Sequence, residues 1–194
     1  MAYNTVIFDL DGTLVDSAPG ILHSLHAACF EVGVPTIVPL DAQLIGPPLQ
    51  QVLRTVVGEQ PKKVIDQLTC AFKKHYDNTG FLKTEAFPNV EAMLMSLAVH
   101  GCTMYVATNK RQIPTTRIVR KLAWEHFFKH VYSLDSLASN IATKADLINH
   151  VVCTHKLRRR STVYVGDRDD DGIAARTARI PFILAAWGYG CNRD

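Results

Sequence analysis

The chain has 194 residues, of which 47% are hydrophobic and 20% are charged, with a formal net charge of +3. This composition is typical of a globular protein with a sizeable core, and it excludes an intrinsically disordered chain. The small basic excess is well short of that found in nucleic-acid-binding proteins, so we expect no nucleic-acid partner.

The first predicted strand is the apolar run at residues 5–8, and the region after it predicts helices instead of further strands. Three helices are expected there, at residues 19–32, 48–57 and 61–78. Each has a proline near its start and a glycine near its end, an asymmetry typical of helix termini. We therefore expect a helical insert between the first strand and the rest of the chain.

Strands and helices alternate in the remaining sequence. Strands are predicted at residues 103–107, 162–165 and 182–185, with a weaker one at 131–132, and helices at 91–100, 113–122, 144–155 and 173–178. The apolar runs are continuous, as in parallel strands that are buried on both faces. The sequence thus predicts an α/β fold, a doubly wound Rossmann-like parallel sheet with an inserted all-helical cap. Residues 1–16 and 83–194 would form the core, and residues 17–82 the cap.

Acidic and small polar residues follow three of the predicted strands. They are Asp9 and Asp11, then Thr108 and Asn109, then Asp167 and Asp171. The carboxyl ends of parallel strands meet at one edge of the sheet, where ligands bind in such folds. Asp9 and Asp11 are two residues apart, so their side chains point to the same side of an extended backbone. Together with Asp167 they form an oxygen-rich site that suits Mg²⁺.

This group of residues predicts phosphoryl transfer. A carboxylate beside a cation can attack phosphorus, and a second carboxyl can protonate the leaving oxygen and then activate water. Gly12 allows the backbone to turn into an anion-binding nest, and Thr108 adds a hydroxyl group. Lys144, at the start of a predicted helix, is placed to balance the negative charge.

These motifs resemble those of the haloacid dehalogenase-like superfamily of phosphohydrolases, over essentially the full chain. The chain looks closest to the phosphoglycolate-phosphatase-like branch with a helical cap. The matching motifs are D-x-D-G-T at residues 9–13, Thr108, Lys144, and G-D-x-x-x-D at residues 166–171. Three departures stand out. Lys144 lacks the usual glycine-containing approach, and Arg111 replaces a common proline. Asp169 and Asp170 leave open which acidic residue of the fourth motif lies nearest the metal.

The resemblance implies a role for each matching residue. Asp9 would be the nucleophile, and Asp11 would be the acid/base and reach the metal through its carbonyl. Asp167 would bind the metal and Asp171 would support its water shell. The phosphate-binding residues would be Gly12, Thr108, Asn109 and Lys144. The segment at residues 44–53 would face the active site.

We therefore expect a Mg²⁺-dependent phosphatase that hydrolyses a small, for example phosphoglycolate-like, phosphomonoester through an aspartyl-phosphate. The alternatives are a phosphomutase of the same fold and a non-catalytic regulatory binding protein. Thr13, in place of the valine often found in mutases, favours hydrolysis. The sequence leaves the substrate and the choice between monomer and dimer open. It also leaves open whether Lys110 and Arg111 face solvent or phosphate, and whether Arg54 meets a substrate carboxylate.

The cysteines and the N-terminal residues predict a cytoplasmic protein. The five cysteines (Cys29, Cys70, Cys102, Cys153 and Cys191) are widely spread and form no C-x-x-C motif, so we expect reduced thiols. The first residues lack the pattern of a signal peptide, and no apolar run is long enough to cross a bilayer. We expect no membrane partner.

Overall fold

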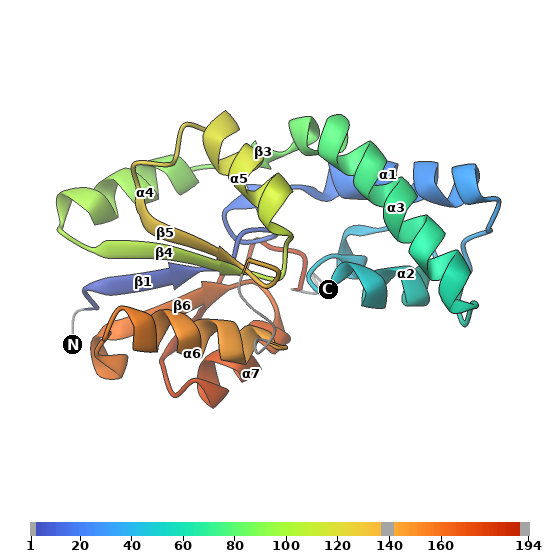
Figure 1. The fold of residues 1–194 in the computed structure, drawn as a ribbon. Helices are drawn as coiled ribbons and strands as arrows, with labels where there is room; N and C mark the ends of the chain where they lie inside the picture. The colour runs from blue at the N-terminus through green and yellow to red at the C-terminus, as the bar shows by residue number, and fades with distance from the viewer. Residues whose placement is uncertain (1–2, 137–141, 191–194) are drawn as a thin grey trace.

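The computed structural model describes residues 3–136 and 142–190, and its centre is a five-stranded sheet (Figure 1). The strand order is β5-β4-β1-β6-β7, and every neighbouring pair is parallel. The strands are β1 (Thr5–Phe8), β4 (Thr103–Thr108), β5 (Phe128–Ser133), β6 (Thr162–Gly166) and β7 (Phe182–Leu184). This topology confirms the predicted doubly wound α/β fold.

Helices cover both faces of the sheet. Two lie on one face, α4 (Val90–Val99) and α5 (Gln112–Lys121), and two on the other, α6 (Lys144–Thr154) and α7 (Asp169–Thr177) (Figure 1). Alternate residues of β1 enter the two cores: Phe8 packs in the cluster that includes Leu94 of α4, and Ile7 in the cluster that includes Leu147 of α6. Burial on both faces explains why the strands are continuous apolar runs.

Strand β1 lies where the order of the strands reverses. It pairs with β4 on one side and with β6 on the other, so that Phe8 lies beside Val106 and Val165. In open parallel sheets the ligand crevice lies outside the carboxyl ends of the strands at this point. The residues that follow β1, β4 and β6 therefore meet at one edge.

The segment between β1 and α4 is mainly helical and lies beyond this edge of the sheet (Figure 1). Its elements are α1 (Ala18–Val32), η1 (Ala42–Leu44), α2 (Leu49–Val57), α3 (Lys62–Asn78) and η2 (Gly80–Lys83). It has an apolar core of its own, in which Leu25, Leu53 and Leu68 are fully buried. Gly33, with a φ of 74°, ends α1 in the left-handed conformation that glycine favours.

Two short strands join the helical segment to the sheet. β2 (Val15–Asp16) and β3 (Glu85–Ala86) pair antiparallel, with Asp16 opposite Glu85. They were not predicted, because two residues are too few to form a pattern. Because β2 and β3 pair, the two chain segments that connect the helical segment to the sheet run side by side, close to the predicted boundaries at residues 16/17 and 82/83. The division into core and cap stays a prediction.

Two other elements differ from the predicted bounds by more than one residue. Strand β5 begins at Phe128, three residues before the predicted start. The prediction missed these residues because exposed Lys129 and His130 interrupt the apolar pattern of this strand at the edge of the sheet. Helix α7 begins at Asp169 and not at residue 173, since carboxylates are favourable in the first turn of a helix.

Within residues 3–136 and 142–190, no helix has the length and apolar character needed to cross a membrane. The cysteines in this part of the chain are Cys29, Cys70, Cys102 and Cys153, and all four are free. Cys191 lies outside the described residues.

Candidate active site

The carboxyl ends of β1, β4 and β6 bring most of the predicted site residues together. The buried polar residues there are Asp9, Asp11, Thr108, Asp167 and Asp171, each no more than 9% exposed. Burying several carboxylates is costly unless cations or hydrogen-bond donors compensate their charge. The contacts of each carboxylate therefore show what the site is built to hold.

Three of the carboxylates form a cluster. Asp9, Asp167 and Asp171 each offer one oxygen, and these oxygens lie within 4.8 Å of one another. Asp167 Oδ2 accepts hydrogen bonds from the backbone N–H groups of Tyr189 and Gly190, at 2.8 and 3.2 Å. Asp9 Oδ1 is buried and has no hydrogen-bond partner. A buried anionic oxygen without a donor is a position that a cation fits.

Two lysines supply part of the missing positive charge. Lys144 Nζ lies 3.1 Å from Asp9 Oδ2 and 2.5 Å from Asp171 Oδ1. Lys110 Nζ lies 3.0 Å from both carboxylate oxygens of Asp11. Four carboxylates facing two ammonium groups leave two negative charges, which a divalent cation would neutralise. The carboxylate of Asp11 thus faces Lys110 and is not part of the three-residue cluster.

The buried charges shift the pKa values of the site. Burial raises the pKa of Asp9 to about 7, and nearby carboxylates add to this increase while Lys144 opposes it. Burial also raises the pKa of Asp167. Burial alone would lower the pKa of Lys144, but the charges of Asp9 and Asp171 raise it above its usual value. Lys144 therefore stays protonated, and Asp9 is the group most in need of a further cation.

The raised pKa of Asp9 predicts how stability changes with pH in the absence of divalent cations. Between the ordinary value of 3.8 and about 7, the folded protein retains a proton that the unfolded chain has lost. The free energy of unfolding therefore falls as the pH rises through this range. In Asp9→Asn the side chain at this position cannot titrate, so this fall in the free energy of unfolding is absent. In thermal unfolding with chelator, we expect the wild type to lose stability relative to Asp9→Asn between pH 5 and pH 8. If the melting temperatures of the two proteins changed in parallel with pH, this would contradict the raised pKa of Asp9.

Gly12 and Thr108 line the same edge of the sheet. Gly12 has a φ of 80°, and an added Cβ would overlap the carboxylate of Asp167, so both the turn and the close approach require glycine. The Thr108 hydroxyl accepts a hydrogen bond from the backbone N–H of Lys110, at 3.2 Å. The side-chain amide of Asn109 donates to the carbonyl of Gly46 at 3.0 Å, so this amide links the sheet edge to the helical segment.

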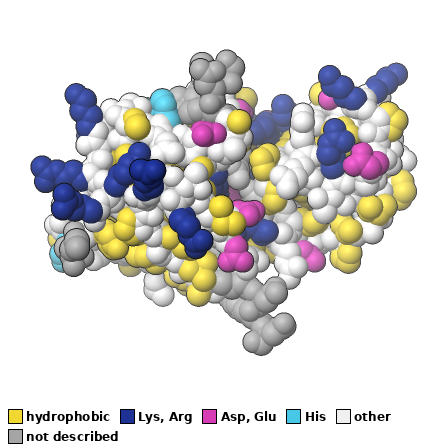
Figure 2. Space-filling view, turned by 90° about the horizontal axis from the view of Figure 1, so that it is seen from below, with side chains coloured by type: hydrophobic (Ala, Val, Ile, Leu, Met, Phe, Trp, Pro, Cys, Tyr) yellow, Lys and Arg dark blue, Asp and Glu magenta, His cyan; other side chains and the backbone are white. Residues whose placement is uncertain are grey.

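A cavity of about 80 Å³ lies between the sheet edge and the helical segment. Asp9, Asp11 and Thr108 line it on the side of the sheet. The other side is mostly apolar and includes Ile21, Leu25, Leu44, Val52, Phe72 and Tyr76. Figure 2 shows a furrow between the two parts of the molecule, with acidic and basic side chains along it. The arrangement combines a charged end with a small apolar chamber.

Several side chains that the sequence left open are now placed. Asp171 is buried in the carboxylate cluster, whereas Asp169 and Asp170 are exposed. Arg111 lines the cavity but is paired with Asp77 of α3, with nitrogen–oxygen distances of 2.9 and 2.5 Å. Arg54 does not line the cavity and lies 3.9 Å from Glu59, so the structure does not place it where it could meet a substrate carboxylate.

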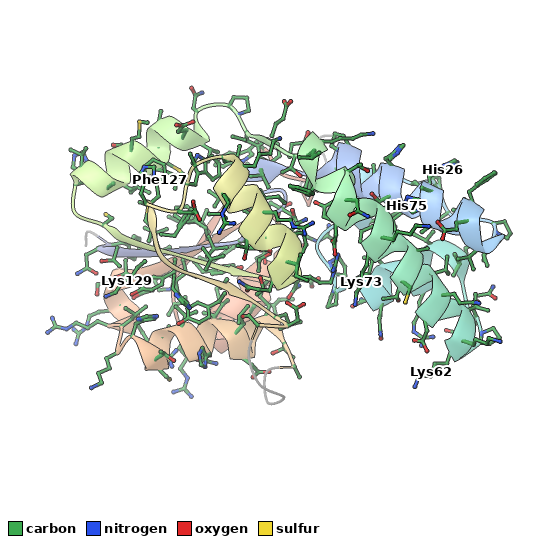
Figure 3. The ribbon with its side chains drawn as sticks, turned by 45° about the horizontal axis from the view of Figure 1, so that its top comes forward. His26, Lys62, Lys73, His75, Phe127 and Lys129 are labelled. Atoms are coloured by element: carbon green, nitrogen blue, oxygen red, sulfur yellow. The ribbon has the colours of Figure 1, made fainter. Side chains whose placement is uncertain are left out.

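Three other charged or titratable side chains lie far from the cavity. Figure 3 shows His26 and Lys62 on the outside of the helical segment, and Lys129 at the opposite end of the molecule. None of these three lines the cavity. These three side chains therefore do not contribute to the charge of the cavity lining.

Besides the pairing of Lys110 with Asp11, sequence reasoning missed two contacts to the site. The hydroxyl of Ser17 donates to Asp11 Oδ1 at 2.6 Å, and the chain around Tyr189 contacts Asp167. Ser17 carried no signal beyond its place before a predicted helix. The Gly188–Gly190 stretch did carry one, because an aromatic residue between two glycines, a few residues after a strand, indicates a close approach of the backbone.

Comparisons with known proteins add independent findings. A family model for haloacid dehalogenase-like hydrolases matches residues 6–185. A tyrosine-protein kinase, PtkA of Mycobacterium tuberculosis, is 32% identical over 189 residues; the match covers 95% of this chain but only 62% of that protein. A phosphoglycolate phosphatase of Xanthomonas campestris is 31% identical, covering 97% of this chain and 86% of the relative. A haloacid dehalogenase-like hydrolase of Streptococcus pneumoniae has a solved structure with a TM-score of 0.85 and 29% identity, covering 98% and 88% of the two chains.

Proposed function

The chain belongs to the haloacid dehalogenase-like hydrolase family, as the motifs indicated, and we propose that it is a phosphatase of small phosphomonoesters. The observation that carries this proposal is the unpartnered Oδ1 of Asp9 at the cavity, within a cluster of three carboxylates. With one oxygen of this carboxylate bound to a cation, the other is suited to attack on phosphorus. Among the relatives named above, the phosphoglycolate phosphatase supports this class of reaction.

The carboxylate cluster fits a divalent cation, and we propose Mg²⁺. Asp9, Asp167 and Asp171 would hold it, with Asp11 joining through its carbonyl as the family resemblance implies. When bound, the cation would offset the repulsion between the nucleophile and the phosphate of the substrate. The unpartnered oxygen of Asp9 and the two uncompensated negative charges support this assignment.

The proposed reaction has two steps carried by Asp9 and Asp11. An oxygen of Asp9 forms a bond to phosphorus as the bond to the leaving oxygen breaks, and the Asp11 carboxyl gives its proton to that oxygen. Asp11 then takes a proton from a water molecule that attacks phosphorus, which releases phosphate and restores Asp9. Lys144 holds the Asp9 carboxylate in place, and Gly12 and Thr108 would bind the phosphate together with Lys144.

We further propose that residues 17–82 form a cap over a core made of residues 1–16 and 83–194. The apolar side of the cavity comes from this segment, so closure would exclude water from the phosphorus during the first step. The contacts between Arg111 and Asp77 and between Asn109 and Gly46 hold the two parts together at the cavity. The small cavity favours a compact leaving group.

The proposal is tested by measuring phosphate release. Protein stripped with chelator and then supplied with Mg²⁺ would be incubated with p-nitrophenyl phosphate, phosphoglycolate, a sugar phosphate and a nucleoside monophosphate. We expect hydrolysis of at least one ester, abolished when Mg²⁺ is withheld. Transfer of phosphate to a sugar hydroxyl faster than to water would indicate a mutase. No turnover of any ester would contradict the phosphatase proposal.

A further inference from the structure

The chain that follows β7 passes directly over the site. The backbone N–H groups of Tyr189 and Gly190 both donate to Asp167 Oδ2. A Cβ added at Gly188 would overlap the side chain of Asp167 and the carbonyl of Gly12, and one added at Gly190 would overlap the carbonyl of Asp167. The two glycines therefore allow the backbone to lie against the carboxylate cluster, with Tyr189 held between them.

The side chain of Tyr189 reaches from this position to the start of α1. Its hydroxyl donates to Asp16 Oδ1 at 2.7 Å and accepts from the backbone N–H groups of Ser17 and Ala18, at 2.7 and 3.0 Å. The first N–H groups of a helix have no partner within the helix. A tyrosine from the other end of the chain thus supplies the acceptor that a capping side chain usually provides.

This arrangement leaves the side chain of Ser17 free for another contact. Ser17 is the residue before α1, but its side chain makes no capping hydrogen bond. It is fully buried, and its hydroxyl donates to Asp11 Oδ1 at 2.6 Å. Ser17 therefore links Tyr189 to Asp11: its backbone N–H donates to the Tyr189 hydroxyl, and its own hydroxyl donates to the Asp11 carboxyl.

We propose that Tyr189 is a positioning residue for Asp11, acting through Ser17. Its hydroxyl fixes the first turn of α1, and this turn sets where the Ser17 hydroxyl holds the Asp11 carboxyl, which Lys110 Nζ contacts at 3.0 Å from both oxygens, relative to the leaving oxygen. The inference rests on the proposed phosphatase reaction and assigns a task to a residue that does not touch the substrate. The same hydroxyl binds Asp16 of β2, so it also fixes one of the two connections to the helical segment.

Tyr189→Phe removes this hydroxyl and little else. The ring contact with Phe87, with centroids 6.2 Å apart, and both backbone bonds to Asp167 can remain. Loss of the hydroxyl leaves the Ser17 N–H without its acceptor, whereas the Ala18 N–H keeps its bond to Asp16 Oδ1 at 3.1 Å, so the first turn is held less firmly and can shift. Proton donation by Asp11 should then weaken while attack by Asp9 is retained.

The test compares two esters of similar shape, phenyl phosphate and p-nitrophenyl phosphate, with Mg²⁺ present. p-Nitrophenolate leaves without a proton, whereas the more basic phenolate needs one. The quantity kcat/KM reports the steps up to departure of the leaving group. In Tyr189→Phe, we expect kcat/KM to fall about 30-fold for phenyl phosphate, which is part of the roughly 10²- to 10⁴-fold that general acid catalysis contributes, and less than about 3-fold for p-nitrophenyl phosphate. Tyr3→Phe, at an exposed tyrosine, is the matched control and should change neither value.

A second variant keeps the inference testable if Tyr189→Phe does not fold. Ser17→Ala should give the same selective loss, and the double variant should lose no more than the larger single loss, because both act on Asp11 by one route. Equal losses for the two esters, unchanged kinetics, or additive losses in the double variant would each overturn the inference. Wild-type protein inactive on these two esters and on every ester of the phosphate-release screen would instead overturn the proposed function, and the inference with it. If the wild type hydrolyses only an alkyl ester of that screen, whose leaving oxygen also needs a proton, Tyr189→Phe is compared on that ester, and a loss in kcat/KM below about 3-fold would overturn the inference.

Discussion

Asp9→Asn is expected to abolish phosphomonoester turnover, lowering kcat by about 10⁴-fold or more. Asparagine has nearly the shape of aspartate, but its amide is a poor nucleophile and cannot form the proposed aspartyl-phosphate. Asp9 is only 2% exposed and lies against Lys144, so a change of chemistry without a change of size isolates its role. The assay is phosphate release with Mg²⁺ from the best ester found in the screen.

The matched control for this prediction is Asp66→Asn. Asp66 is an exposed carboxylate on α3 and does not line the cavity, so turnover by the Asp66→Asn variant should equal that of the wild type. Thermal unfolding should show that Asp9→Asn remains folded, since the substitution removes one of several repelling buried carboxylates. Turnover by a folded Asp9→Asn within tenfold of the wild type would exclude Asp9 as the nucleophile.

Lys144→Met should have the next largest effect, on both activity and stability. The ammonium group is 9% exposed and contacts both Asp9 and Asp171, which its removal would leave buried without compensation. Removing one partner of a buried ion pair costs about 3–5 kcal/mol of unfolding free energy. We also expect kcat to fall about 10²- to 10³-fold, because Asp9 loses the charge that keeps it ionised and oriented.

The stability loss of Lys144→Met should depend on pH. Below about pH 7, protonation of Asp9 removes part of the uncompensated charge, so the deficit relative to the wild type should shrink between pH 8 and pH 5.5. Denaturant unfolding with chelator at the two pH values measures this change. Lys62→Met, at an exposed lysine at the start of α3, should show no deficit at either pH. A deficit that does not change with pH would show that the loss comes from packing alone.

The sheet and the acidic edge could be predicted because they depend on local patterns. The apolar runs fix where each strand ends, and the residue types that follow, such as Asp9 and Asp167, then share one edge by the geometry of a parallel sheet. Gly12 was predictable for the same reason, since a glycine directly after the acidic pair indicates a turn. Family membership is shown by the match over residues 6–185, whereas the role of each residue stays a proposal.

The contacts that complete the site could not be predicted because they join distant parts of the chain. Lys110 and Asp11 are 99 positions apart, and Tyr189 and Ser17 are 172 apart. No periodicity or motif links such pairs, and only the packed fold brings them together. The same limit applied to the pairing of β2 with β3, where strands of two residues give no pattern.

The most direct test of the central claim, that Asp9 captures phosphorus, is chemical trapping of the phosphorylated enzyme. Protein mixed with Mg²⁺ and substrate would be acid-quenched within milliseconds, reduced with borohydride and digested, and the modified residue identified by mass spectrometry. Reduction of an aspartyl-phosphate gives homoserine, and we expect it at position 9 and not in Asp9→Asn. Modification of a different carboxylate, or turnover with no trapped residue at any quench time, would contradict the account.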